Sequence, residues 1–195
     1  MDSIDELDDD GIRVFRRNMQ MIFQDPYESL NPRWTIKDII KEPLDIHNIG
    51  ALNDREEAVV EILRTVGLTP PENYLSRYPH EISGGQRQRV SIARTLIMKP
   101  KFVICDEPTS MLDVSIRISI MDLMLNLAKD LDVSYLYITH DLAVARYMCN
   151  RIAVMFNGKI VEIADTEDLL QNPIHPYTKR LISSIPIPDP SYKRE

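Results

Sequence analysis

Apolar-rich segments alternate with stretches of helical periodicity along the chain. Residues 19–23, 102–105 and 133–139 predict strands, and the continuous apolar run at 102–105 is typical of a parallel strand buried on both faces. A stripe of apolar residues at helical spacing precedes the first strand: Ile4, Leu7, Ile12 and Phe15. The alternation predicts an α/β domain.

Residues 25–98 have a different pattern, because prolines interrupt them. We expect helices broken at Pro26, Pro32, Pro43, Pro70, Pro71 and Pro79. One helix has clear ends: Asn53 is its expected N-cap, Glu56 stands three residues later, and Gly67 follows its last turn. Its apolar face holds Val59, Ile62, Leu63 and Val66.

The later part of the chain returns to mixed elements. Asp113 is expected to cap a long helix with the stripe Ile116, Ile120, Leu123, Met124, Leu127 and Leu131. A short helix should open at Asp141. Asn157-Gly158 separates two apolar segments and predicts a β-hairpin. From Thr166 onward we expect a short helical segment and a proline-rich tail.

Composition and charge exclude several classes of protein. A net charge of −7 argues against broad binding to nucleic-acid backbones, which requires a basic surface. The longest uninterrupted apolar run has five residues, against the roughly 20 of a membrane-spanning helix. Cys105 and Cys149 form no metal-spaced or redox pair, and the four histidines are scattered. These features suit a chain in a reducing cytosol.

Two adjacent acids, Asp106 and Glu107, follow the predicted strand at 102–105. Ligands bind at the carboxyl ends of strands in open α/β sheets. Successive strand residues point to opposite sides, so one acid could serve a metal and the other could face an attacking water. Taken alone, the pair has an alternative interpretation without a catalytic role: a strand that happens to end in two acidic residues before a turn.

The sequence Ser83-Gly84-Gly85-Gln86, followed by Arg87-Gln88-Arg89, is more specific. Ser83 is a suitable N-cap for a helix that Pro100 ends. The two glycines would let backbone N–H groups approach an anion at the positive end of this helix. A capped helix with a glycine turn and no ligand is the alternative.

Together these residues resemble the motifs of ABC ATPases. Ser83–Gln86 lies 20 residues before the paired acids and is similar to the ABC signature. Gln24 resembles the Q-loop glutamine, Ser110-Met111-Leu112-Asp113 resembles the D-loop, and His140 resembles the switch histidine. Five motifs in one order make chance matching negligible.

The resemblance implies a role for each site residue. Glu107 would be the general base, and His140 would contact the γ-phosphate of ATP. Asp106 and Gln24 would serve Mg²⁺. The residues implied to bind ATP, partly on a second cassette, are Gln24, Ser83, Gly84, Gly85, Gln86 and Asp113.

Two further segments narrow the resemblance to one branch. Asp25 to Arg33 and Asn172 to Thr178 are similar to the ATPases of oligopeptide, dipeptide and nickel importers. Without the family they read as proline-punctuated turns. The branch implies a second ATPase subunit (identical or different), integral permease subunits, and indirectly a peptide-binding protein. It also implies a peripheral place on the cytoplasmic face of the membrane, where the segment 25–33 and its subdomain would dock.

We therefore expect a P-loop NTPase domain of α/β class, incomplete at its N-terminus. Residues 1–24 and 99–165 would form the catalytic core, residues 25–98 an inserted helical subdomain, and residues 166–195 a C-terminal extension. No Gly-x-x-x-x-Gly-Lys-Ser/Thr phosphate loop (Walker A) occurs in the sequence. We therefore expect ATPase activity coupled to transport to need a segment beyond these residues.

Two other functions remain open from the sequence. The chain could be a non-catalytic relic or regulatory fragment that cannot bind ATP alone. An ABC ATPase of DNA repair is the other rival, although it would need a coiled-coil insertion or a basic groove. The transported substrate is not readable from these residues.

Overall fold

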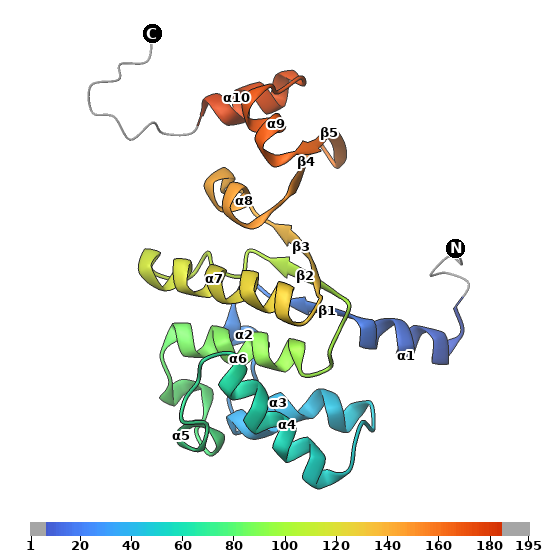
Figure 1. Cartoon of the computed structure of the whole chain (residues 1–195), viewed down its shortest axis with the longest axis vertical. Coiled ribbons are helices and arrows are strands. Elements are labelled where there is room, and N and C mark those ends of the chain that lie inside the picture. The colour runs from blue at the N-terminus through green and yellow to red at the C-terminus, as the bar shows by residue number, and fades with distance from the viewer. Residues whose placement is uncertain (1–6, 185–195) are drawn as a thin grey trace. The chain divides into compact units, whose positions relative to one another are not determined.

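The computed structural model describes residues 7–184. These residues divide into two compact units, the first ending at Ile138 and the second beginning at Thr139. Figure 1 gives the order of their helices and strands. Among residues 7–184, no helix combines the length and apolar character that a membrane span requires.

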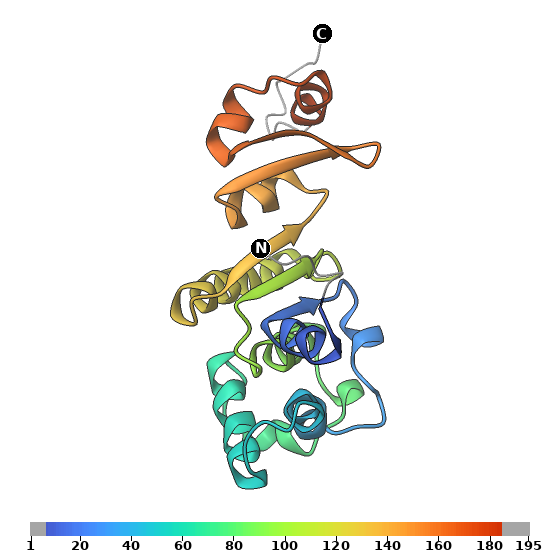
Figure 2. The same cartoon turned by 90° about the vertical axis from the view of Figure 1, so that its right-hand side faces the viewer.

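A parallel three-stranded sheet forms the centre of the first unit. Its strands are β1 (Met19–Ile22), β2 (Phe102–Asp106) and β3 (Ser134–Ile138), in the order β1-β2-β3. Ile22 pairs with Cys105, and Asp106 pairs with Ile138. Figure 2 shows the three strands next to one another. The predicted strands and the α/β class are thereby confirmed.

Only one face of this sheet is well covered within the described residues. Ile22, Val103 and Cys105 are fully buried on that face, where the Thr95 hydroxyl of α6 (Gly84–Leu96) donates to the Met21 carbonyl oxygen at 3.4 Å. On the opposite face Leu136 and Ile138 are 49% and 45% exposed. The prediction that the 102–105 strand is buried on both faces is therefore wrong for this sheet, since its side chains alternate between buried and half-buried.

We predict that the purified 195-residue chain self-associates. In the described part of the sheet β1 and β3 are edge strands, and an exposed edge beside an open apolar face recruits other chains. Light scattering should show the average molecular mass rising with protein concentration. The double variant Leu136→Thr/Ile138→Thr should reduce this self-association. Ile174→Thr, at an 81% exposed position in the other unit, is the control. A monodisperse monomer of the parent chain would contradict the prediction.

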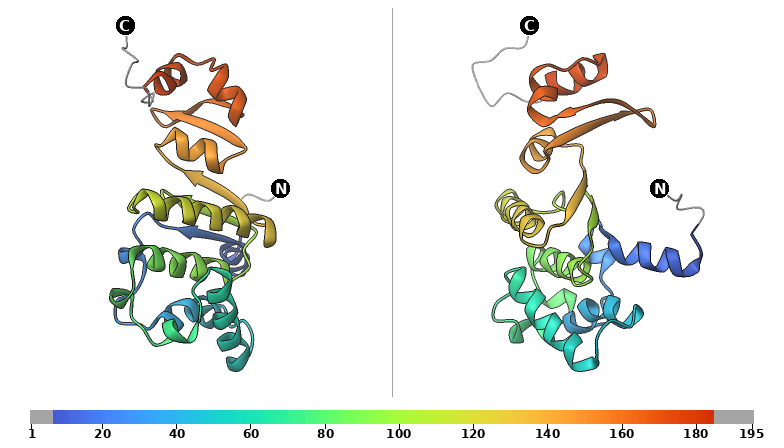
Figure 3. Two further views of the ribbon diagram at one scale, coloured as in Figure 1. Left: turned by 60° about the vertical axis from the view of Figure 1, so that its left-hand side comes forward. Right: turned by 45° about the vertical axis from the view of Figure 1, so that its right-hand side comes forward.

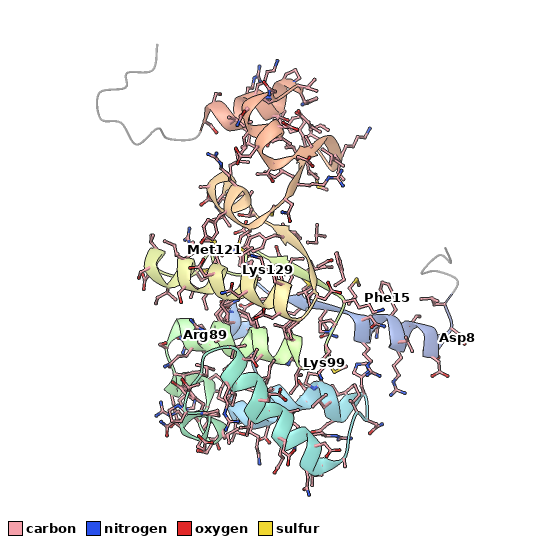
Figure 4. The ribbon with its side chains drawn as sticks, viewed as in Figure 1. Asp8, Phe15, Arg89, Lys99, Met121 and Lys129 are labelled. Carbon is pink, nitrogen blue, oxygen red and sulfur yellow. The ribbon has the colours of Figure 1, made fainter. Side chains whose placement is uncertain are left out.

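Helices form the rest of the first unit. The first, α1 (Asp9–Asn18), begins at the N-cap Asp8, whose Oδ1 accepts from the Gly11 N–H at 2.8 Å; Figure 4 labels Asp8 and Phe15 on it. Ile4 of the predicted stripe lies outside the described residues. The others are α2 (Pro26–Ser29), α3 (Ile36–Ile46), α4 (Leu52–Thr65), α5 (Glu72–Leu75), the short 3-10 helix η2 (Pro79–Glu81), α6 and α7 (Val114–Asp130).

The prolines do not all break helices as expected. Pro26 and Pro79 stand in the first turn of α2 and η2, where a missing N–H costs nothing. Pro43 instead lies inside α3, so the predicted break there is wrong. The helix continues for one further turn because its apolar face, which includes Ile40 and Leu44, is buried.

Helix α4 begins before the predicted cap. Ala51 is the N-cap, and its N–H donates to the Asp54 carboxylate at 3.1 Å, so the prediction of Asn53 as cap is wrong. Asp54 stands at the third helical position, where a carboxylate can reach back to the cap. The C-terminal prediction is confirmed: Gly67 has φ +75°, and the Leu68 N–H donates to the Leu63 carbonyl oxygen at 2.9 Å, as in a Schellman motif.

The second unit is built on a hairpin. It contains α8 (Leu142–Met148), β4 (Arg151–Phe156), β5 (Lys159–Asp165), α9 (Thr166–Gln171) and α10 (Pro176–Ser183). The predicted turn is confirmed, since Asn157 and Gly158 have φ +49° and +75°, the signs of a type I′ turn. Its core contains Ala145, Ile152, Val154 and Leu169.

Helix α10 replaces part of the proline-rich tail that the sequence predicted. His175 is its N-cap and Pro176 its first residue, a position that proline favours. Residues 185–195 of the tail lie outside the described residues. The predicted division into residues 1–24 with 99–165, 25–98 and 166–195 stays a prediction.

Candidate functional site

The carboxyl edge of the sheet brings two distant motifs together. Parallel strands end at the same edge, so Gln24 after β1 and Glu107 after β2 arrive close to each other. The Gln24 Nε2 donates to the Glu107 Oε2 at 3.4 Å, across 83 residues of sequence. The structure thus joins the proposed Q-loop glutamine and the proposed base.

Glu107 leaves the strand in an unusual backbone conformation. Its φ is +42°, a left-handed value that costs a non-glycine residue roughly 1–3 kcal/mol. Three hydrogen bonds hold it: its N–H donates to the Ile138 carbonyl oxygen at 3.0 Å, and its carbonyl oxygen accepts from the N–H (3.1 Å) and the hydroxyl (3.0 Å) of Ser110. Strand alternation therefore does not set the direction of Glu107, contrary to the sequence argument. Its left-handed turn does.

Asp106 and Gln24 offer oxygen atoms of the kind that Mg²⁺ prefers. Asp106 is the last residue of β2 and is half-buried. Because the Gln24 Nε2 donates to Glu107, the amide oxygen of Gln24 is left as an acceptor. In the described part of the chain, no group of three or more His, Cys, Asp and Glu side chains could hold a metal. The residues fit a Mg²⁺ that takes most of its ligands from phosphates and water.

The signature residues form the start of α6. The Ser83 Oγ accepts from the Gln86 N–H at 3.3 Å, and the Gln86 Oε1 accepts from the Ser83 N–H at 2.9 Å. This reciprocal capping box confirms Ser83 as the N-cap. Gly84 and Gly85 occupy the first two helical positions, where backbone N–H groups have no partner within the helix.

The two glycines differ in what surrounds them. A Cβ on Gly85 would lie 2.7 Å from the Ile116 Cγ2 of α7, closer than real side chains approach. A Cβ on Gly84 would lie 3.8 Å from the Leu112 Cδ2, an ordinary contact. Figure 3 shows α6 and α7 running beside each other. Gly85 is thus explained by helix packing, whereas packing places no such demand on Gly84.

Arg87 is a structural residue of the site that the sequence did not reveal. Its side chain is buried, and its Nη1 donates to the carbonyl oxygens of Pro79 (3.0 Å) and Ile82 (2.6 Å). The guanidinium carbon lies 3.7 Å from the centre of the Tyr27 ring, a cation–π contact. Arg87 therefore ties the segment after Gln24 to the signature helix. In the sequence, Arg87 stood out only as part of the basic segment Arg87-Gln88-Arg89 after the signature, and such a segment does not indicate a buried side chain.

The proposed D-loop lies against the same helix. Leu112 is the nearest neighbour of a Cβ on Gly84, and the Thr109 hydroxyl lies 3.2 Å from the Tyr137 hydroxyl oxygen of β3. Asp113 occupies the N-cap position of α7 as predicted, but its side chain makes no capping hydrogen bond. Its contact with nucleotide stays a prediction.

His140 belongs to the second unit, in the turn that leads into α8. The Asp141 N–H donates to the Thr139 Oγ1 at 3.0 Å, and the Asp141 Oδ1 accepts from the N–H groups of Ala143 (2.8 Å) and Val144 (3.3 Å). Asp141 therefore caps α8 as predicted. The role of His140 at a γ-phosphate stays a prediction.

The C-terminal segment at 172–178 is held by one carboxylate of β5. The Glu162 Oε1 accepts from the Ile174 N–H at 2.8 Å, and its Oε2 accepts from the His175 N–H at 3.0 Å. The Thr178 hydroxyl and then these two N–H groups lower the pKa of Glu162 from its usual value. The ring of Tyr177 also packs on Phe156, with centroids 4.3 Å apart.

We predict that Glu162→Gln loosens this segment. An amide has one acceptor oxygen, so one of the two N–H groups loses its partner, and exchange of the Ile174 and His175 amides should accelerate. Because the folded-state pKa of Glu162 is lowered, its stabilisation holds above the ordinary value of about 4.3 and fades as the pH falls through the folded pKa. In acid, the exchange rates of the Ile174 and His175 amides in the parent protein should therefore approach those in Glu162→Gln. Glu167→Gln, which removes a carboxylate bonded to Arg146, is the control. Unchanged exchange in Glu162→Gln would refute the assignment.

Comparison with known proteins defines the class: the chain belongs to the ABC transporter family, whose model matches residues 2–110. Residues 161–195 match the C-terminal region of oligopeptide/dipeptide transporters. The resemblance drawn from the motifs is thereby confirmed.

Curated relatives narrow the similarity to the oligopeptide and dipeptide branch. The oligopeptide transport ATP-binding protein OppF of Bacillus subtilis is 54% identical over 181 residues, which are 92% of this chain and 59% of that protein. The dipeptide transport ATP-binding protein DppF of Lactococcus lactis is 50% identical over 185 residues, 94% of this chain and 59% of its own length. The chain thus spans about three fifths of these relatives.

Solved structures agree with this fold. One neighbour is the ATP-binding cassette MJ0796, described as a dimer in a post-hydrolysis state bound to ADP and Pi. Its TM-score is 0.69 at 31% identity, over 83% of this chain and 68% of that one. Another is cbiO1 of Clostridium perfringens, part of the ABC transporter complex cbiONQ, with a TM-score of 0.74 at 27% identity, over 85% of this chain and 64% of its own. The P-loop NTPase class predicted from the sequence is confirmed.

Proposed function

We propose that this chain is the catalytic and coupling part of an ATP-hydrolysing subunit that drives an importer of oligopeptides or dipeptides. The contact between the Gln24 Nε2 and the Glu107 Oε2 carries the proposal, because it joins the end of β1 to the end of β2 at the edge where α/β folds bind ligands. The names of the curated relatives support the peptide substrate.

Glu107 is the base in this proposal. Its carboxylate is oriented by the left-handed backbone at the strand end and by the Gln24 amide, and it accepts the proton of an attacking water. Asp106 and the Gln24 amide oxygen hold Mg²⁺, which neutralises charge on the phosphates of ATP when bound. His140 donates to the γ-phosphate.

The signature end of α6 acts on nucleotide held by a second ATPase subunit. Gly84 and Gly85 present N–H donors at a helix N-terminus, with Ser83 and Gln86 fixing the first turn. Asp113 approaches the same nucleotide from the start of α7. The dimer with ADP and Pi described for MJ0796 supports such a partner.

The segment from Asp25 to Arg33 docks a permease subunit at the cytoplasmic face of the membrane. Two side-chain caps order it: the Asp25 Oδ1 accepts from the Tyr27 N–H at 2.7 Å, and the Asn31 Oδ1 accepts from the Arg33 N–H at 3.1 Å. Tyr27 is 60% exposed and the adjoining Trp34 38%, and aromatic side chains of this kind favour interfaces. A peptide-binding protein then acts through the permease.

A signature substitution tests the proposal in a heterodimer of subunits extended by the family's phosphate-binding segment. Ser83→Arg should lower turnover at the partner's nucleotide site by about 10-fold or more, while ATP binding by its own subunit stays unchanged, because the signature faces the other nucleotide. Ser83→Asn retains the helix cap and is the control for loss of the capping bond. Nucleotide binding and steady-state hydrolysis are measured with one site disabled at a time. Full turnover at the partner's site with Ser83→Arg would reject the assignment.

A further inference from the structure

A pocket lies in the first unit, where β1 and β2 begin rather than where they end. It measures about 570 Å³, within the range of small-molecule sites. Beside the pocket, the Lys101 N–H donates to the Asn18 carbonyl oxygen at 3.0 Å, which joins the start of β2 to the start of β1. The lining of the pocket comes from the end of α1, from α3, from α4 and the turn between them, and from the residues after α6; Figure 4 labels Lys99 in this last segment.

The floor of the pocket is apolar. Leu44, Ile97 and Met98 are buried beneath it, with exposed fractions of 5%, 8% and 3%. Ile49 and Val14 stand at its walls, and Val14 remains 60% exposed. An apolar group would therefore contact side chains already in place, as in small-molecule sites, whose linings are mostly apolar.

The rim of the pocket carries positive charge. Arg17 and Lys99 are exposed, and neither pairs with a carboxylate within residues 7–184. Arg55 is fixed by Asp45, with 2.6 Å between the Arg55 Nη1 and the Asp45 Oδ1. The one carboxylate of the lining, that of Asp54, accepts from the Ala51 N–H. In a chain of net charge −7, this local excess of cations stands out.

We propose that this pocket binds a phosphate monoester of an apolar group. Arg17 and Lys99 would contact the phosphate, since guanidinium and ammonium groups are the usual phosphate ligands. Leu44, Ile97 and Met98 would cover the apolar part. The ligand could be a soluble ester or the headgroup of a membrane lipid, and both present the same chemistry. None of the pocket residues belongs to the proposed ATP site, so the inference stands apart from it.

Calorimetry of the 195-residue chain with octyl phosphate tests the proposal. Saturable binding at one site is expected, with inorganic phosphate and octanol each binding much more weakly. Arg17→Gln/Lys99→Asn should weaken the binding by at least about 10-fold, since each substitution removes a charge-assisted hydrogen bond. Asn is chosen because Lys99 has φ +51°, which asparagine tolerates. Lys129→Gln, on the exposed surface of α7, is the matched control and should bind as the parent does.

Vesicles separate the two sources of ligand. The chain is mixed with phosphatidylcholine vesicles that contain phosphatidic acid, and with vesicles of phosphatidylcholine alone. Binding to the first kind only, lost in Arg17→Gln/Lys99→Asn, assigns the pocket to a lipid headgroup; no vesicle binding beside saturable octyl phosphate binding assigns it to a soluble ester. Absence of any saturable binding, or binding equal in the double variant and the parent, overturns the proposal. Circular dichroism melts confirm that the variants remain folded.

Discussion

Glu107→Gln is expected to reduce ATP hydrolysis by about 10²-fold or more while leaving ATP binding largely unchanged. The substitution is made in a protein that joins this chain to the family's phosphate-binding segment. Removal of a general base costs 10²–10⁴ in rate, and the amide keeps the size of the side chain. Steady-state turnover and equilibrium binding of ATP are measured on the same preparations.

The structure supplies the reason why binding should survive. The Gln24 Nε2 can donate to the amide oxygen of the new side chain as it does to the Glu107 Oε2. The backbone bonds from Glu107 to Ile138 and Ser110 involve no side-chain atom of Glu107. Glu56→Gln is a matched control, because Glu56 is an exposed carboxylate bonded to Lys37. Hydrolysis by Glu107→Gln at the parent rate would show that the paired acids only end a strand.

The sequence predicted the strands that form this edge, because strand patterns are local and parallel strands follow from the alternation with helices. Apolar segments that alternate with helices imply a parallel sheet, and parallel strands deliver their last residues to one edge. The contact between Gln24 and Glu107 agrees with this topology, although in the sequence the two residues were connected only through the resemblance to ABC ATPases. The hairpin at Asn157-Gly158 and the stop at Gly67 were equally predictable, since both need a positive φ that few residues adopt.

Other features depended on neighbours that a linear pattern does not show. The sequence predicted Asn53 as the N-cap of α4, but the helix begins earlier, with Ala51 as its N-cap, because the Asp54 carboxylate accepts from the Ala51 N–H. Pro43 sits within α3 because buried side chains outweigh the lost hydrogen bond. Arg87 is charged and yet buried, since two carbonyl oxygens and the Tyr27 ring surround it. In each case tertiary contacts decided the outcome.

Gly85 is the residue whose predicted role changes most. The sequence assigned both glycines of the signature to the approach of an anion. Only at Gly85 would an added Cβ clash, because it would lie 2.7 Å from the Ile116 Cγ2. We expect Gly85→Ala to destabilise the fold by about 1–3 kcal/mol, the usual cost of overpacking. The gain of about 0.5–1 kcal/mol from replacing a helical glycine offsets part of it.

Gly84→Ala is the matched variant, one residue away in the same helical turn. Its Cβ would meet the Leu112 Cδ2 at 3.8 Å, so its melting temperature should equal or exceed that of the parent. Ile116→Ala removes the Cγ2 that a Cβ on residue 85 meets. The double variant Gly85→Ala/Ile116→Ala should therefore be more stable than the sum of the single changes implies, and this coupling isolates the clash. Equal melting temperatures for Gly84→Ala and Gly85→Ala in thermal unfolding would contradict this prediction. They would show that α6 and α7 can move apart enough to fit the added methyl group, so that packing against Ile116 does not require a glycine at position 85.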